Sequence, residues 1–311
     1  TTDNGQQTTD RSATQGDACQ SKNGQQTTDR SATQRDACQS KNGQQTFEKS
    51  IIRKFEVSLN QEKLRNMTIH RYTASDKAQW DSFIDASRNG TFLFRRDFMD
   101  YHADRFRDHS LICADEKGWL AVLPANEGND AEGTPTLWSH QGLTYGGFVL
   151  APRIGTGMVM ALFDAVRCYL RQEGFRQWHY KQVPYIYHRQ PAEDDEYALW
   201  RIGATLETCN IATAIDLRSP LHIPMEERRG RGQRRALKTG YAVRELTDPE
   251  HLTDYWPIIE DNLRTTHATR PVHSCAEMQL LMRRFPTAIR CWVAEKEDGT
   301  AGGVLVMFET D

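Results

Sequence analysis

From residue 67 onward, short β-type apolar runs alternate with segments whose apolar residues recur at helical spacing. This alternation is typical of α/β proteins, in which helices cover the faces of a sheet. The order strand, helix, helix and hairpin occurs twice. The first copy is predicted at 68–73, 76–87, 96–106, 110–115 and 119–125, and the second at 241–246, 249–267, 274–284, 288–295 and 303–309. We therefore predict an α/β fold built from two related units.

The two copies differ beyond the hairpin. After the first, the sequence predicts a strand region at 136–150, a helix at 157–173, a strand at 176–183, a helix at 194–202 and two strands within 205–217. After the second hairpin the sequence stops at Asp311. A last strand without a neighbour presents unpaired N–H and C=O groups. We therefore expect the second unit to be truncated and these 311 residues to be a fragment of a longer protein.

The N-terminal part has a different composition. Residues 1–46 contain no Val, Ile, Leu, Met, Phe, Tyr or Trp, and a 19-residue unit at 4–22 recurs at 23–41 with Arg35 in place of Gly16. A segment without large apolar side chains cannot offset the entropy lost on folding. The predicted organisation is disordered repeats at 1–46, a linker or short helix at 47–66, a first domain at 67–220, and a basic helix with half of a second domain at 221–311.

Composition limits the class of protein. With 39 Lys and Arg against 42 Asp and Glu, the formal net charge is -3, which gives no overall preference for nucleic acid. No apolar run approaches the roughly 20 residues that span a bilayer, and the seven cysteines form no C-x-x-C pair. We expect a cytoplasmic protein with reduced thiols. No metal site is predicted, because Pro271 interrupts the one cluster of His, Cys and Glu, at 267–277.

One strand-to-helix turn carries a recognisable pattern. The run VLAPRIGTGM at 149–158 resembles the acyl-CoA pyrophosphate loop of the GNAT acetyltransferase superfamily, and the order of elements around it resembles the GNAT fold. In that loop, backbone N–H groups at a helix N-terminus hold phosphate oxygens. The resemblance implies that acyl-CoA, as acetyl-CoA, is the cosubstrate and that it is bound at Val149, Arg153, Gly155 and Gly157. An ordinary strand-to-helix turn is the alternative.

Longer phrases point to a narrower group. SHQGLTYGG at 139–147, YKQVPYIYHRQPAEDDEYAL at 180–199 and PVHSCAEMQLLMRRFPTAI at 271–289 resemble bacterial GNAT-like proteins allied to the Fem-type peptidyltransferases, which carry two GNAT units in tandem. The resemblance implies tandem acyl-CoA N-acyltransferase folds with mixed, mostly antiparallel sheets. It implies an N-acyltransferase that acts on an amine of a small molecule or envelope precursor. The alternatives are an aminoacyl-tRNA-dependent peptidyltransferase and a degenerate GNAT pair that binds without catalysis.

Direct acyl transfer to an amine needs a base, an acid for the leaving thiolate and an oxyanion-binding N–H, which the resemblance places on the strand within 142–150. We identify His140, Tyr145, Lys181 and His188 as candidate catalytic residues. A histidine titrates near neutral pH, but a lone loop histidine is often structural. Lys181 is either a cation facing the cleft or a solvated strand residue. Tyr145-Gly146-Gly147 is alternatively a bulge that lets the sheet splay.

Substrate contacts are expected from Tyr180, Tyr187, Asp195 and Arg234. Asp194, beside Asp195, is the predicted N-cap of the 194–202 helix. Arg234 belongs to the basic helix at 228–238, which carries six cations in eleven positions. This helix is either a phosphate-binding surface for tRNA or a solvated helix between domains.

Overall fold

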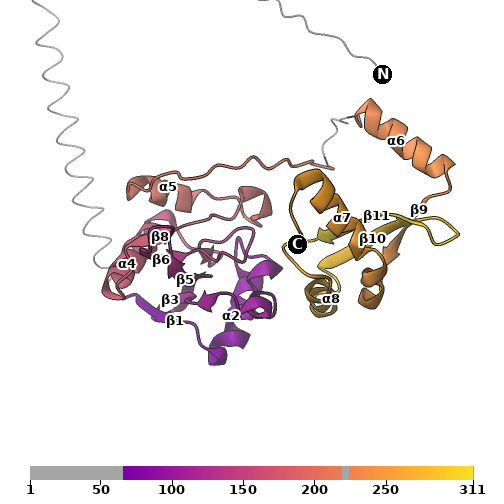
Figure 1. The fold of residues 1–311 in the computed structure, drawn as a ribbon. Helices are drawn as coiled ribbons and strands as arrows, with labels where there is room; N and C mark the ends of the chain where they lie inside the picture. The colour runs from indigo at the N-terminus through magenta and orange to yellow at the C-terminus, as the bar shows by residue number, and fades with distance from the viewer. Residues whose placement is uncertain (1–65, 219–223, 311) are drawn as a thin grey trace, which may run out of the picture. The chain divides into compact units, whose positions relative to one another are not determined.

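The computed structural model describes residues 66–218 and 224–310 (Figure 1). The predictions for residues 1–46 and 47–66 lie outside the described residues, apart from residue 66. Strands and helices alternate along the described chain, and the sheets contain both antiparallel and parallel pairs. The predicted mixed α/β fold class is confirmed.

The first unit contains two four-stranded sheets, with orders β1-β3-β4-β7 and β2-β5-β6-β8. All strand pairs in them are antiparallel except β6 with β8. Its elements are β1 (Thr68–Arg71), η1 (Ala74–Asp76), α2 (Lys77–Ala86), η2 (Phe92–Phe94), α3 (Arg96–Met99), η3 (Asp100–His102), β2 (Arg107–Asp108), β3 (Leu111–Asp115), β4 (Gly118–Leu123), β5 (Asn126–Asn129), β6 (Pro135–Trp138), β7 (Val149–Leu150), α4 (Thr156–Gln172), β8 (Gln177–His179), η4 (Tyr185–Tyr187) and α5 (Asp194–Arg201).

The second unit repeats the opening topology of the first. Its sheet has the order β9-β10-β11 with both pairs antiparallel, as in β1-β3-β4. In both units helical segments lie between the first strand and the hairpin, five of them together with β2 in the first unit and three in the second. The elements are α6 (Glu227–Lys238), β9 (Ala242–Leu246), η5 (Pro249–Asp254), α7 (Trp256–His267), α8 (Cys275–Arg284), β10 (Ile289–Glu295) and β11 (Ala301–Phe308). The tandem arrangement is therefore visible within the chain itself.

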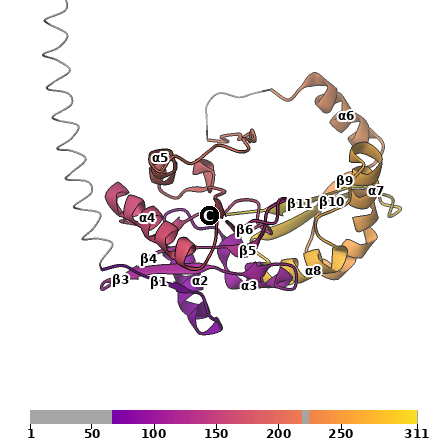
Figure 2. The ribbon, with the colours of Figure 1, turned by 60° about the vertical axis from the view of Figure 1, so that its left-hand side comes forward.

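Helix α4 covers one face of the first sheet, as Figure 2 shows. Val159, Leu162, Phe163 and Val166 are fully buried and recur at helical spacing, so one stripe of α4 faces the strands. Burying each of these side chains contributes about 1.5–3 kcal/mol. The helix begins after the turn at 151–155 that follows β7, and it ends before Gly174, whose φ of 86° is a left-handed conformation suited to glycine. No described helix is long and apolar enough to cross a membrane.

Three predicted elements are wrong. The helix expected at 249–267 is divided into the 3-10 helix η5 and the α-helix α7. The helix expected at 96–106 is split into the four-residue α3 and the 3-10 turn η3. The strands expected within 205–217 do not form: this segment is extended and pairs with no strand among the described residues, and its apolar side chains, including Ile211, are exposed. An alternating sequence becomes a strand only where a neighbour supplies the ladder of hydrogen bonds.

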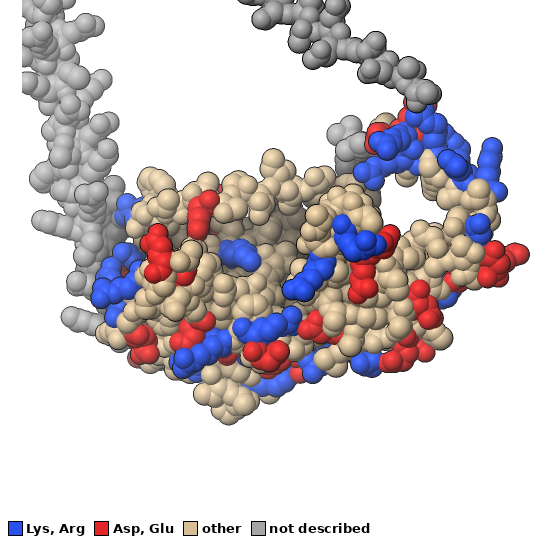
Figure 3. Space-filling view, in the orientation of Figure 1, with Lys and Arg blue, Asp and Glu red and all other residues tan. Residues whose placement is uncertain are grey.

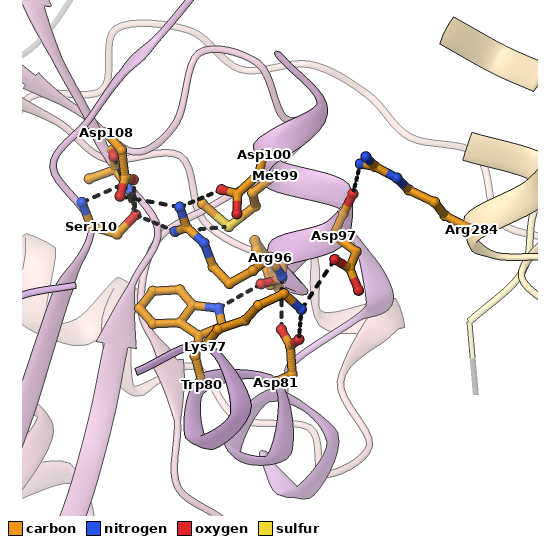
Figure 4. A network of polar contacts seen from close by, with 12 residues as sticks. Lys77, Trp80, Asp81, Arg96, Asp97, Met99, Asp100, Asp108, Ser110 and Arg284 are labelled. Carbon is orange, nitrogen blue, oxygen red and sulfur yellow. Dashed lines mark hydrogen bonds and ion pairs between the residues drawn. The ribbon is translucent and has the colours of Figure 1, made fainter. Parts of the chain in front are cut away.

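A buried arginine explains why the 96–106 segment turns. Arg96 is 3% exposed, and its guanidinium forms ion pairs with Asp100 at 2.6 Å and Asp108 at 3.2 Å (Figure 4). It also lies over the ring of Tyr72, 3.8 Å from the ring centroid. The backbone N–H of Arg96 donates to Asp81 at 2.8 Å. Burying a cation costs free energy unless it is paired, so these contacts fix the chain around residue 96, although Nε of Arg96 has no hydrogen-bond partner among the described residues.

We predict that Arg96→Met destabilises the protein by about 2 kcal/mol, because it removes the charged hydrogen bonds that join residue 96 to Asp100 and Asp108. The neighbouring Arg95→Met is the control: Arg95 pairs with Asp85 at the surface, and both side chains are more than 40% exposed. Exposed pairs contribute about 0–1 kcal/mol. Urea denaturation measures both changes, and equal losses in the two variants contradict the prediction.

Candidate functional site

Two segments run side by side and then separate at the centre of the first unit. β6 pairs with β8 in parallel, and the pairing continues as Ser139 N–H donates to His179 O at 2.9 Å and Gly146 N–H donates to Lys181 O at 2.8 Å. Beyond Gly146 the chain turns away into β7, which pairs with β4 instead. The edge of β7 that faces away from β4 is therefore available for contacts other than strand pairing.

Glycines permit this divergence. A Cβ on Gly146 would collide with the carbonyl oxygen of Ser139. Gly147 has a φ of 75°, and a Cβ there would lie 2.6 Å from Cζ of Tyr180. Because both positions exclude a side chain, Tyr180 can approach the backbone and its hydroxyl accepts a hydrogen bond from Phe148 N–H at 2.8 Å. The Tyr-Gly-Gly sequence marks a local splay of the sheet.

Several predicted site residues meet beside this splay. The Tyr145 and Tyr187 rings lie 5.0 Å apart, centroid to centroid. Tyr145 is buried and its hydroxyl donates to Thr91 Oγ1 at 3.1 Å, and burial raises the pKa of Tyr145 to about 12. Lys181 Nζ donates to Leu143 O at 2.8 Å, and desolvation lowers the pKa of Lys181. Both polar groups are thus bonded within the protein, and Lys181 does not present a free cation.

Tyr180 and Asp195 form a buried pair. The Tyr180 hydroxyl donates to Asp195 Oδ2 at 3.1 Å, and Glu196 N–H donates to the other carboxylate oxygen at 3.1 Å. Asp195 is 7% exposed, and burial raises its pKa. Burial, followed by the nearby Asp195 charge, raises the pKa of Tyr180 well above its usual value. The hydroxyl therefore remains protonated and links Phe148 N–H to the carboxylate.

A pocket lies on the other side of Asp195, between α5 and the chain around η4. Its walls include Tyr185, His188 and the carboxylates of Glu193, Asp195 and Glu196. His188 Nε2 lies 3.1 Å from Val183 O. A carbonyl can only accept, so Nε2 carries the proton and Nδ1 carries a lone pair. Among the described residues, Nδ1 has no hydrogen-bond partner. This nitrogen is itself buried, so His188 lines the acidic pocket and carries a lone pair that solvent does not reach.

His140 lies in a different environment. It is 3% exposed, its φ of 53° is left-handed, and its ring stacks on His102 with centroids 5.2 Å apart. Burial, helped by His102 and more distant cations, lowers the pKa of His140 to about 3. Such an imidazole stays neutral and is a weak base. The structure does not place His140 where a substrate amine can reach it, and a packing role fits its surroundings.

The corner between β7 and α4 holds the predicted cofactor residues. Val149 lies in β7, Arg153 in the turn, Gly155 at the N-cap of α4 and Gly157 in its first turn. Nothing lies within 4 Å of a Cβ built on Gly155, so space is open there, as a phosphate loop requires. No polar contact links Arg153 to another described residue.

The hydrogen-bonding groups on the free edge of β7, the strand before this loop, are already occupied. Leu150 N–H donates to Asn89 Oδ1 and Asn89 Nδ2 donates to Phe148 O, each at 2.8 Å. Phe148 N–H is bonded to the Tyr180 hydroxyl. The N–H groups that could bind an oxyanion or the amides of acyl-CoA are therefore occupied. As it stands, this corner does not fit acyl-CoA.

Asp194 corrects a second prediction. It is the first residue of α5 rather than its N-cap, which is Glu193. Its carboxylate accepts from Arg88 Nη2 at 2.7 Å and from the Thr156 hydroxyl in the first turn of α4. Arg88 and Asn89, which organise this corner, are not among the residues predicted from the sequence. Their partners are 59–106 residues away along the chain, and no local motif marks them.

Arg234 is not brought to this site. It lies on α6, and it contacts none of the other predicted site residues in the part of the chain that the structure describes. The residues that the structure describes contain no group of three or more His, Cys, Asp and Glu placed to hold a metal ion.

Comparisons with known proteins give similar folds at low identity. No protein-family model matches the chain, and no curated protein matches it. One similar solved structure is FemX, at 11% identity and a TM-score of 0.48 over 74% of this chain; the chain spans 58% of the length of that protein. Another is a ribosomal-protein-alanine N-acetyltransferase from Brucella melitensis biovar Abortus 2308, at 11% identity and a TM-score of 0.34, over 48% of this chain and 99% of that one.

A third is aminoglycoside N-acetyltransferase AAC(6')-Iy, solved in complex with CoA, at 14% identity and a TM-score of 0.32, over 49% of this chain and 95% of that one. These neighbours are GNAT-type and Fem-type proteins, the groups that the sequence resembles. Because the identities and TM-scores are low, the tandem fold assignment rests on the repeated strand order and on the splay at Gly146.

The buried histidines make stability depend on pH. Burial lowers the pKa of His109 to about 4 and that of His140 to about 3. Both side chains remain neutral in the folded state as the pH falls from 6.5 to 5, whereas they take up protons in the unfolded chain. The contribution of these two neutral histidines to the free energy of unfolding is therefore fully present above pH 6.5, and it is lost as the pH falls towards their folded-state pKa values.

We predict that each of these histidines accounts for a loss of about 2 kcal/mol between pH 7 and pH 5. His140→Gln should flatten the pH dependence of the free energy of unfolding by that amount, measured with urea at the two pH values. The exposed His267→Gln is the matched control and should leave the slope unchanged. An unchanged slope in His140→Gln contradicts the assignment.

Proposed function

We propose that the chain is an N-acyltransferase and that the pocket beside α5 binds its amine acceptor. The observation that carries the proposal is the hydrogen bond from His188 Nε2 to Val183 O, which leaves the Nδ1 lone pair without a partner among the described residues, at a pocket containing Asp195. A primary amine is a cation at neutral pH and must lose a proton before it can act as a nucleophile. The pocket offers an acidic lining, and His188 is the base beside it once a local movement exposes its buried Nδ1.

The pocket suits a cationic amine. Glu193, Asp195 and Glu196 attract the ammonium group, and the exposed ring of Tyr185 offers a surface for it. His188 Nδ1 accepts one proton from the ammonium group, and the nitrogen lone pair then forms a C–N bond with the carbonyl carbon of a thioester. The C–S bond breaks, and the thiolate leaves and takes up the second proton that the nitrogen loses. A thioester such as acyl-CoA is the donor that the sequence resemblance implies, and no step is assigned to it at the α4 corner.

Amine-dependent acyl transfer tests this proposal. With acetyl-CoA or aminoacyl-tRNA as donor, we expect a panel of primary amines to include an acceptor that accelerates donor consumption. His188→Gln should lower kcat by about 100-fold or more, because a positioned base contributes roughly 10²–10⁴-fold. Asp195→Asn should raise KM for the amine. Both variants should bind the donor as the wild type does.

Glu207→Gln is the control, because Glu207 is an exposed acid that pairs with His179 outside the pocket. It should leave kcat and KM unchanged. Amine binding without transfer by the wild type would support a non-catalytic binding module instead. If the wild type neither binds any amine nor transfers an acyl group to one, the proposal is rejected.

A second candidate function follows from α6. Of its six cations, Arg229 and Arg231 pair with Glu226 and Glu227, while no polar contact engages the side chains of Arg228, Arg234, Arg235 and Lys238 among the described residues. Figure 3 shows Lys and Arg side chains gathered over α6. Such a helix could bind the phosphates of an aminoacyl-tRNA donor. This would make the chain a Fem-type peptidyltransferase.

If tRNA binds α6, changing the four unpaired cations to Gln weakens tRNA binding by 10-fold or more and lowers the salt dependence of the affinity. The control is Arg283→Gln with Arg264→Gln, two exposed arginines on α8 and α7 that are paired with acids. Filter binding at two salt concentrations measures both. An unchanged salt slope in the α6 variant means that α6 is a solvated helix.

A further inference from the structure

The open edge of β7 is occupied by the protein itself. In an antiparallel pair, alternate residues direct their N–H and C=O to the same side, so Phe148 and Leu150 present four such groups away from β4. All four are hydrogen-bonded. The Asn89 carboxamide donates to Phe148 O and accepts from Leu150 N–H. The Tyr180 hydroxyl accepts from Phe148 N–H, and the N–H of Arg88 donates to Leu150 O at 3.1 Å.

Asn89 makes the contacts that an amide ligand would make. Its carboxamide donates once and accepts once along the strand edge, which is the pattern of a peptide-like amide lying beside a strand. The side chain is 2% exposed. Its loop is held in place because Gly90 N–H donates to Ser87 Oγ at 2.9 Å, and Ser87 Oγ donates to Ile84 O at 2.6 Å. The carboxamide is a built part of the edge.

An internal carboxylate stands at the start of α4. Helix N-termini attract anions, and here Asp194 is bonded to the Thr156 hydroxyl in the first turn. Arg88 is 7% exposed and fixes this arrangement, because one nitrogen donates to Asp194 at 2.7 Å and another to Ile154 O at 3.3 Å. A carboxylate from α5 thus lies beside the first turn of α4, bonded to the Thr156 side chain.

We propose that the chain's own amide and carboxylate, from Asn89 and Asp194, replace an acyl donor in the β7–α4 corner of the first unit. The corner is closed to acyl-CoA and serves instead to fix α5, whose next residue, Asp195, faces the amine pocket. Arg88 and Asn89 are positioning residues in this arrangement. The first unit then provides the acceptor side of the proposed reaction, which is where this inference rests on the proposed function. The closure itself does not depend on it.

Amide hydrogen exchange of the full chain with 1 mM acetyl-CoA tests the closure. We expect slow exchange at Phe148 and Leu150 in the wild type, with no change in residues 145–158 when acetyl-CoA is added. Added protection or an exchange increase confined to these residues overturns the proposal, because it places the donor in the corner. This measurement needs no variant and no transferase activity.

A variant tests the role of the carboxamide. Asn89→Ala removes the partner of Leu150 N–H, so this amide should exchange at least 10-fold faster. Asn126→Ala is the matched control, because Asn126 is also a buried asparagine, bonded to Gln141 away from β7. If Asn89→Ala leaves exchange at Leu150 unchanged, the carboxamide does not close the edge. Should Asn89→Ala unfold, the wild-type experiment with acetyl-CoA decides alone.

These outcomes are separable from the proposed function. Amine transfer that fails while residues 145–158 remain insensitive to acetyl-CoA rejects the acyltransferase and leaves the closure intact. Transfer that succeeds together with acetyl-CoA protection of these residues supports the enzyme and rejects the closure.

Discussion

The hydrogen-bonding requirement of the β7 edge organises the first unit. A buried backbone N–H or C=O without a partner costs about 1–3 kcal/mol. Once the strands separate at Gly146, no described strand is available to pair with Phe148 and Leu150 on that side. The chain satisfies these groups with Asn89 and Tyr180, which come from a loop after α2 and from the segment after β8. One strand edge that lacks a neighbouring strand thus holds the loop after α2 and the segment after β8 in place.

The two units show how the same topology is completed differently. β4 has β7 on its outer side, whereas β11, at the equivalent place in the second sheet, has no strand on that side among the described residues. Leu305 and Met307 in β11 are exposed. The first unit therefore has a splay whose polar groups are satisfied by side chains and loop backbone. By contrast, the outer edge of β11 has no strand partner among the described residues.

Local patterns predict most elements and only part of the site. The stripe of buried residues in α4 and the alternation in β10 are short-range signals, and both elements form as expected. The 96–106 segment is predicted as one helix because nothing local reveals that Arg96 is held by Asp108 from another element. The 205–217 segment has strand-like alternation, but pairing is a property of the neighbours. The periodicity of a sequence indicates neither the long-range contact of Arg96 nor the missing neighbour of the 205–217 segment.

The site residues divide in the same way. Tyr180, His188 and Asp195 are identifiable because one segment concentrates them, and the structure brings Tyr180 against Asp195 and both His188 and Asp195 to one pocket. The sequence does not indicate that Lys181 is bonded to Leu143 O, or that Asp194 serves α4 instead of capping α5. These roles depend on which backbone groups the splay leaves unpaired.

Tyr180 connects the β7–α4 corner to the pocket beside α5. Its hydroxyl accepts from Phe148 N–H on the strand edge and donates to Asp195 in the pocket. Because the hydroxyl has one proton, donating it to Asp195 leaves only lone pairs for the strand, which suits an N–H and excludes a carbonyl. The orientation of Asp195 is therefore tied to the closure of β7. A ligand that displaced Tyr180 from the strand would also remove a hydrogen-bond partner of the buried Asp195 carboxylate, so the lining of the pocket beside α5 depends on the contact between Tyr180 and β7.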